Sequence, residues 1–280
     1  MVIAVLGGLG AAVCWAGAAL SAARASRLIG ARSVLAWVML VGFVVVAPLT
    51  AAAGFPDGLG PGEVGWIALS GAGNVAGLLC SYEAMRLGRV SIVAPITSTE
   101  GAIAALLAVA TGEALGAESL VLLGAIAVGV VLASRTESIE TGQPTRSTLL
   151  AVCAAACFGS SLFATARVSQ ALPLVFALIP PRLVGVAAIT VPSAVTRRLV
   201  LTRAALPLVV LSGLCEVGGF ASYAVGARHA IAVSAVLASQ FAALAAVAAY
   251  FLFHERLRPL QVAGVATIAV GVALLTAVRV

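Results

Sequence analysis

Long apolar segments constrain this sequence more than any other feature. Runs of about 20 predominantly apolar residues recur along the chain, and a helix needs that length to cross the hydrocarbon core of a bilayer. Short connections with glycine, proline or charge separate the runs. The pattern predicts ten transmembrane helices, near residues 3–22, 34–53, 65–86, 90–111, 117–134, 148–166, 173–195, 204–226, 231–252 and 259–277.

Composition supports a membrane protein. Of the 280 residues, 62% are hydrophobic and 9% are charged, whereas a soluble domain carries roughly 25% charged residues. The net charge is +6, but a nucleic-acid partner would need a soluble basic face, so none is expected. The five cysteines lie in apolar runs without CxxC spacing. We therefore expect neither disulfides nor a bound metal or other cofactor.

The sequence repeats itself at an offset of 142 to 143 residues. Residues 126–130 and 268–272 both read Ile-Ala-Val-Gly-Val, 142 positions apart. Near the start of the chain, Trp15 falls on Phe158 at an offset of 143. Matches in one register along the chain indicate two copies of one unit. The predicted organisation is a five-helix repeat at 1–135, a polar linker at 136–146 and a second five-helix repeat at 147–280.

An odd number of helices in each repeat makes the second repeat inverted relative to the first. Arginine marks cytoplasmic loops, and the arginine-rich loops alternate between the repeats as inversion requires. One side of the predicted bundle collects twelve arginines and the other three, which places both termini outside the cytoplasm. We therefore expect an all-α integral membrane protein with ten transmembrane helices in two inverted repeats.

Short motifs recur at the ends of equivalent helices. A Gly-Glu pair at 112–113 and a His-Glu pair at 254–255 close the fourth and ninth predicted helices, and a glycine-rich helix follows each. Ser-Tyr pairs at 81–82 and 222–223 close the third and eighth, and Pro95 lies near the start of the fourth. With ten helices in two halves, the chain resembles the EamA-like transporters of the drug/metabolite transporter superfamily over nearly its whole length.

The resemblance implies a secondary transporter, often an exporter, with a central cavity. Predicted helices 1–4 and 6–9 would line this cavity, and helices 5 and 10 would back the bundle. Such proteins usually keep both termini in the cytoplasm, which is opposite to the arginine count. The orientation and the direction of transport therefore stay open.

Polar residues within the predicted helices are candidates for a substrate site. Inserting a charged residue at the centre of a transmembrane helix costs about 2.5–3.5 kcal/mol on insertion scales. Such a residue is therefore a candidate for a functional role. Glu100 lies near the middle of the fourth helix, and the repeat register pairs Glu216 with Asn74. Arg182 follows two prolines that could open the seventh helix, and its guanidinium could hold a substrate carboxylate or phosphate. The cavity candidates are Glu100, Glu216, Arg182, Asn74, Gln240, Ser98 and Trp15, and no catalytic residue is expected.

Each main candidate also has a structural interpretation. Glu100 could be permanently protonated and bonded to a neighbouring helix, and Asn74 and Glu216 could form hydrogen bonds between helices. Arg182 could be fixed in an ion pair with either glutamate. A low-dielectric environment favours the neutral form of a carboxyl group, so Glu100 and Glu216 are also candidates for proton coupling.

The sequence predicts a secondary transporter, working by alternating access, for a small polar or zwitterionic metabolite such as an amino acid. One arginine with two glutamates favours a zwitterion. A multidrug exporter of lipophilic cations is an alternative that needs Arg182 turned away from the cavity. A non-transporting membrane scaffold or receptor is another, in which Glu100, Glu216 and Arg182 pair with one another and leave no cavity.

An enzyme is not expected, because the two histidines show no metal-ligand spacing and there is no GxSxG or P-loop motif. The expected location is the cell membrane, as a multi-pass protein of a bacterial inner membrane. The expected partners are a small-molecule substrate, the lipid bilayer and protons as a candidate coupling ion. The chain is expected to be a monomer or a homodimer.

Overall fold

Long helices make up the protein. The computed structural model describes residues 1–54, 56, 58–87, 93, 96–114, 116–134, 144–241, 243–244 and scattered positions between 259 and 274. All regular secondary structure in these residues is helical. Within them, 6 helical segments are long and apolar enough to cross a membrane: Val2–Ile29, Ala31–Ala53, Pro61–Met85, Arg146–Ala171, Val175–Val195 and Leu206–Ala227. The prediction of an all-α, multi-pass membrane protein is confirmed.

The helices fall near the predicted segments. The first half contributes α1 (Val2–Ile29), α2 (Ala31–Ala53), α3 (Pro61–Leu87), α5 (Glu100–Ala110) and α6 (Ala117–Ser134). The second half contributes α7 (Pro144–Ala171), α8 (Val175–Gly185), the π-helical turn η1 (Val186–Thr190), α9 (Val191–Val195), α10 (Leu206–Ala227) and α11 (Ile231–Ala238). Much of the predicted tenth helix, most of the linker and the motifs at Pro95 and 254–255 lie outside the described residues. The ten-helix count and the inverted repeat therefore stay predictions.

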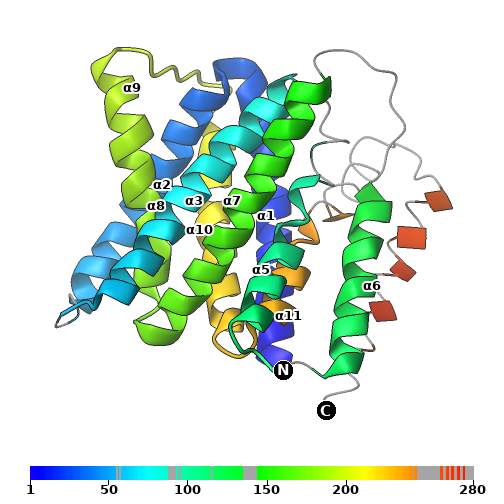
Figure 1. Cartoon of the computed structure of the whole chain (residues 1–280). Helices are drawn as coiled ribbons and strands as arrows, with labels where there is room; N and C mark the ends of the chain where they lie inside the picture. Colours follow the sequence, from blue (N-terminus) through cyan, green and yellow to red (C-terminus); the bar gives the residue numbers. More distant parts are fainter. Residues whose placement is uncertain are drawn as a thin grey trace.

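Two helix pairs, each joining the two halves, form the centre of the bundle. α1 packs along α10, and α3 packs along α7 (Figure 1). Glycine makes both contacts close: a Cβ on Gly7 would lie 2.6 Å from Cα of Gly226, and a Cβ on Gly77 would lie 2.5 Å from the Phe158 ring. Small residues let helix backbones approach in a membrane, where dispersion and hydrogen bonds hold helices together.

Buried hydroxyl groups add hydrogen bonds to these two helix pairs. The hydroxyls of Ser70 on α3 and Thr165 on α7 lie 2.6 Å apart. The hydroxyl of Ser212 on α10 donates to the carbonyl of Ala18 on α1 at 3.2 Å. Ser212 follows Ser70 by 142 positions, so residues paired by the repeat register make comparable contacts in the two helix pairs.

The helix that carries Arg182 continues through its prolines. Pro180 and Pro181 lie inside α8, and the chain passes through η1 into α9 without leaving helical geometry. The expectation that the prolines open the helix is wrong, because the irregularity is the π-helical turn that follows them. A local π adjustment lets a membrane helix satisfy backbone groups that proline frees. The Thr190 hydroxyl fastens this turn to α2 by donating to the Ala36 carbonyl at 2.9 Å.

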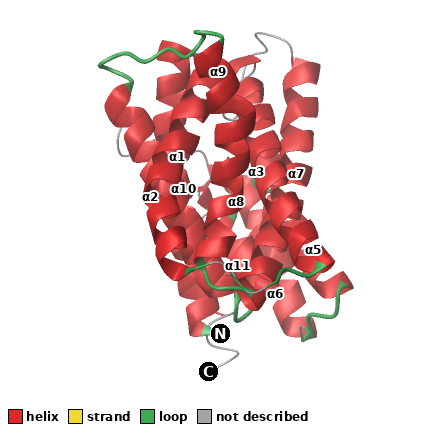
Figure 2. Ribbon diagram, turned by 90° about the vertical axis from the view of Figure 1, so that its left-hand side faces the viewer, coloured by secondary structure: helices red, strands yellow, loops and turns green. Residues whose placement is uncertain are grey.

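The two ends of the bundle are built differently. The N-terminus and α11 lie toward one end, and α9 with the segment after it lies at the other (Figure 2). At the first end, Glu113 just after α5 accepts hydrogen bonds from the backbone N–H groups of Ile231 and Ala232, at 3.1 and 3.2 Å. Its carboxylate therefore caps the N-terminus of α11 and joins the two halves.

A central cavity as candidate functional site

A cavity with about 60 Å³ of water-accessible space lies between α1, α3, α5, α7 and α10. The lining residues are Trp15, Ala19, Asn74, Leu78, Ser81, Tyr82, Met85, Glu100, Phe158, Ser161, Leu162, Glu216, Phe220 and Phe241. Residues from both halves of the chain therefore build one internal space.

The cavity brings together four of the predicted site residues, Trp15, Asn74, Glu100 and Glu216. The other three, Arg182, Gln240 and Ser98, are buried but are not among its lining residues. Arg182 lies behind Glu216, and Gln240 precedes the lining residue Phe241.

The lining helices differ in part from those that the resemblance implied. Among the described residues, α6, the fifth predicted helix, contributes nothing to the lining. The same holds for α2 and α8, which were expected to line the cavity. The reason is the close packing of α1 on α10 and of α3 on α7, which encloses the cavity and leaves α2 and α8 behind it.

Glu100 is the first residue of α5 and is 5% exposed. A position in the first helical turn suits a carboxylate, because the N-terminal end of a helix carries partial positive charge. Within the part of the chain that the structure describes, Glu100 has no ion-pair partner. The cavity is therefore the place from which a counter-ion or a proton can reach it.

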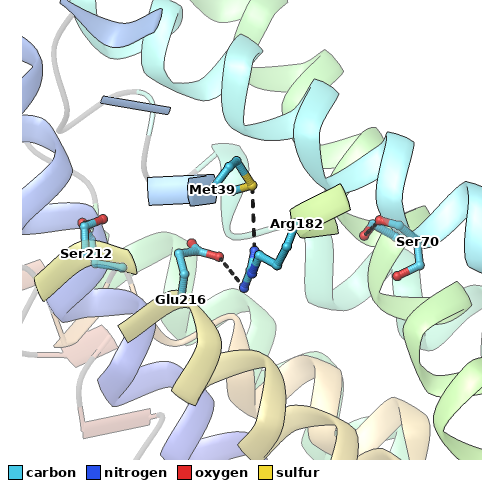
Figure 3. Close-up of polar contacts among 7 residues, drawn as sticks. Met39, Ser70, Arg182, Ser212 and Glu216 are labelled. Atoms are coloured by element: carbon cyan, nitrogen blue, oxygen red, sulfur yellow. Dashed lines mark hydrogen bonds and ion pairs between the residues drawn. The ribbon is translucent and has the colours of Figure 1, made fainter. Parts of the chain in front are cut away.

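Glu216 on α10 has a cationic neighbour. Nη2 of Arg182 lies 3.8 Å from Oε2 of Glu216, and Nη1 of Arg182 lies 3.9 Å from the sulfur of Met39 (Figure 3). The guanidinium carbon is also 5.2 Å from the centre of the Phe220 ring, which is cation–π distance. Because 3.8 Å is too long for a hydrogen bond, the contact is a loose ion pair.

Glycine makes room for the arginine side chain. A Cβ on Gly42 would lie 2.8 Å from both Cδ and Nε of Arg182, and one on Gly185 would collide with the side chain of Met39. Arg182 itself is 0% exposed. The surrounding helices therefore hold the guanidinium in one place, outside the lining of the cavity.

Aromatic rings supply much of the cavity wall. Trp15 lies edge-to-face with Phe220 at 5.4 Å between ring centroids, and Tyr82, Phe158 and Phe241 complete the set. We call these five residues the aromatic wall. The negative faces of aromatic rings attract organic cations.

Buried polar atoms of the lining lack protein partners. Among the described residues, Nε1 of Trp15, Oδ1 of Asn74 and Oε2 of Glu216 have no hydrogen-bond partner in the protein. Buried polar groups are nearly always paired in native structures, so atoms like these mark a place for water or a ligand.

Sequence reasoning missed most of the aromatic wall. Tyr82, Phe158, Phe220 and Phe241 were not among the predicted site residues. A signal for Phe158 was present, because the repeat register places it on Trp15. The others lie in apolar runs, where an aromatic residue facing a cavity has the same sequence signature as one facing lipid.

A helical membrane protein with an internal, partly polar cavity between its two halves has the architecture of a membrane transporter. Comparison with known proteins defines the class further. The model of the EamA-like transporter family, which is part of the drug/metabolite transporter superfamily, matches residues 2–135 of the chain. The resemblance drawn from the sequence is therefore confirmed over residues 2–135, and the family implies a membrane transporter of the drug/metabolite type.

The fold itself is shared with solved proteins. Among these, 26 chains match. One, known from a crystal structure, has a TM-score of 0.78 and 18% sequence identity, over 98% of this chain and 96% of its own. At that identity the likeness concerns the fold alone. No curated protein sequence matches the chain.

Proposed function

We propose that the protein is a secondary transporter, working by alternating access, that carries an aromatic or amphipathic organic cation through the central cavity. The observation that carries this proposal is the lining: two carboxyl groups, Glu100 and Glu216, face a space walled by five aromatic residues. A carboxylate attracts the charge of an organic cation, and the rings attract the same charge and its apolar groups. In this proposal the transporter exports the cation from a bacterial cell across the inner membrane.

The position of Arg182 supports one of the two substrate classes over the other. A zwitterion needs a positive group for its carboxylate, and Arg182 was the expected donor. With the guanidinium behind Glu216, the described lining offers no arginine or lysine to an acidic substrate. This placement supports the cation over the amino acid.

A non-transporting scaffold would pair its buried charges and leave no internal space. Glu100 has no ion-pair partner among the described residues, and it faces the cavity. A carboxyl group that can gain or lose a proton in this position suits proton coupling. We propose that proton release accompanies the binding of the cation.

Equilibrium binding tests the substrate class. Isothermal titration of the detergent-purified protein would compare benzyltrimethylammonium, phenylalanine and phenylpropionate, which share one ring and differ in charge. We expect the cation to bind more tightly than the zwitterion and the anion. Tighter binding of phenylalanine would instead support the zwitterion, and no binding by any of the three would support the scaffold.

A further inference from the structure

The two carboxyl groups of the cavity lie in different electrostatic surroundings. Glu216 faces a guanidinium at 3.8 Å, whereas Glu100 has no ion-pair partner in the described part of the chain. Burying an unpaired charge is strongly unfavourable, whereas a buried pair compensates its own charge. The net charge of Arg182 and Glu216 together is zero when both are ionised.

The arginine cannot leave its partner easily. A Cβ on Gly42 would lie 2.8 Å from both Cδ and Nε of Arg182, so the α2 backbone lies directly against them, and the Phe220 ring centre lies 5.2 Å from the guanidinium carbon. The sulfur of Met39 lies 3.9 Å from Nη1 of Arg182. A side chain enclosed on these sides and 0% exposed has no room to swing into the cavity.

Other ionisable side chains lie near the two carboxyl groups of the cavity. Tyr82 on α3 and Cys215 on α10 lie within electrostatic range of Glu216, and Tyr223 on α10 lies within range of Glu100. The two carboxyls are also within range of one another. Tyrosine and cysteine are neutral near pH 7, so Arg182 is the cation that acts on this site.

We infer that Arg182 is the fixed counter-ion of Glu216, and that Glu100 is the exchangeable carboxyl group of the cavity. This inference rests on the proposed function. Arg182 is then a positioning residue that pairs with Glu216 and keeps it out of the exchange. When the cation enters, the proton leaves the Glu100 carboxyl for water, and the carboxylate that remains pairs with the cation. One positive charge enters the cavity with the cation, and one leaves it with the proton.

The pH profile of cation binding separates the two carboxyls. Affinity for benzyltrimethylammonium would be measured across pH for Glu100→Gln, Glu216→Gln, Arg182→Met and the double variant Arg182→Met/Glu216→Gln. We expect Glu100→Gln to lose the pH dependence and to bind about tenfold more weakly, the loss of one charge-assisted contact. Glu216→Gln should weaken binding, because Arg182 then repels the cation, but it should keep the pH dependence.

The double variant is the decisive one. It removes both members of the ion pair, so it should recover much of the affinity lost in Glu216→Gln and keep the wild-type pH profile. Loss of the pH dependence in the double variant, or its survival in Glu100→Gln, would overturn the assignment. Arg182→Met alone should add a second titrating carboxyl and broaden the profile.

If the wild-type protein binds no cation, that result counts against the proposed substrate class and not against the pairing of Arg182 with Glu216. A second measurement then tests the pairing. Thermal unfolding in detergent would then compare the two single variants with the double variant. If Arg182 is the counter-ion of Glu216, each single change lowers the unfolding temperature by more than the double change does. Additive losses would contradict the pairing.

Discussion

Arg182 on α8 and Glu216 on α10 face each other across 3.8 Å at the back of the cavity, with the cavity on the glutamate side. The guanidinium of Arg182 therefore pairs with a carboxylate of the protein and not with a substrate. Glu100 has no ion-pair partner among the described residues. A substrate that meets this cavity encounters carboxyl groups and aromatic rings. This lining supports the proposed organic cation as the substrate.

Space for the Arg182 side chain depends on Gly42. The change Gly42→Ala places a Cβ 2.8 Å from Cδ and Nε of Arg182, and we expect it to lower the free energy of unfolding by about 1–3 kcal/mol, as overpacking does. Denaturant titration in detergent would measure the loss. Gly124→Ala on α6 is the matched control, because its Cβ meets nothing within 4 Å. Equal effects of the two changes would show that Gly42 is not there for Arg182.

Phe158 of the aromatic wall should contribute to cation binding. We expect Phe158→Ala to weaken the binding of benzyltrimethylammonium by about 0.5–2 kcal/mol, the range of a cation–π contact. Phe43→Ala on α2 serves as the control, because Phe43 packs against the core and lies outside the lining. Isothermal titration would compare the two. A larger loss of affinity in the control would argue against binding in this cavity.

Glu113 should stabilise the end of the bundle where it caps α11. Glu113→Ala removes the acceptor for the N–H groups of Ile231 and Ala232, and loss of a helix cap costs about 0.5–2 kcal/mol. The exposed Glu118, in the first turn of α6, provides the control change Glu118→Ala. Thermal unfolding of both variants would test this. If the two variants unfold alike, the cap contributes no measurable stability.

The sequence predicted the positions of the long helices because a membrane helix needs about 20 apolar residues. This requirement does not depend on how the helices pack against one another. The sequence also placed Trp15, Asn74, Glu100 and Glu216 in one group, because polar residues stand out inside apolar runs. The position of Arg182 was not predictable in the same way. Whether a guanidinium faces the cavity or the space behind it depends on the rotation of α8 and on the room left by Gly42.

The repeat register was most informative where residues from the two halves meet. It pairs Asn74 with Glu216 and Trp15 with Phe158, and all four line the cavity. The division into repeats at 1–135 and 147–280 stays a prediction, as does the orientation of the termini. Phe220 and Phe241 could not be found from the register, because only the packing of α10 and of the segment after α11 turns them inward.

Cation-driven proton movement in reconstituted vesicles tests the central claim most directly. Proteoliposomes that enclose a pH-sensitive dye would be given an inward gradient of benzyltrimethylammonium, with protein-free vesicles and the Glu100→Gln variant as references. We predict alkalinisation of the lumen only in vesicles with wild-type protein, because one proton leaves the lumen as one cation enters and luminal pH therefore rises. Cation uptake without a luminal pH change, or the same pH change with Glu100→Gln, would contradict coupling through this cavity.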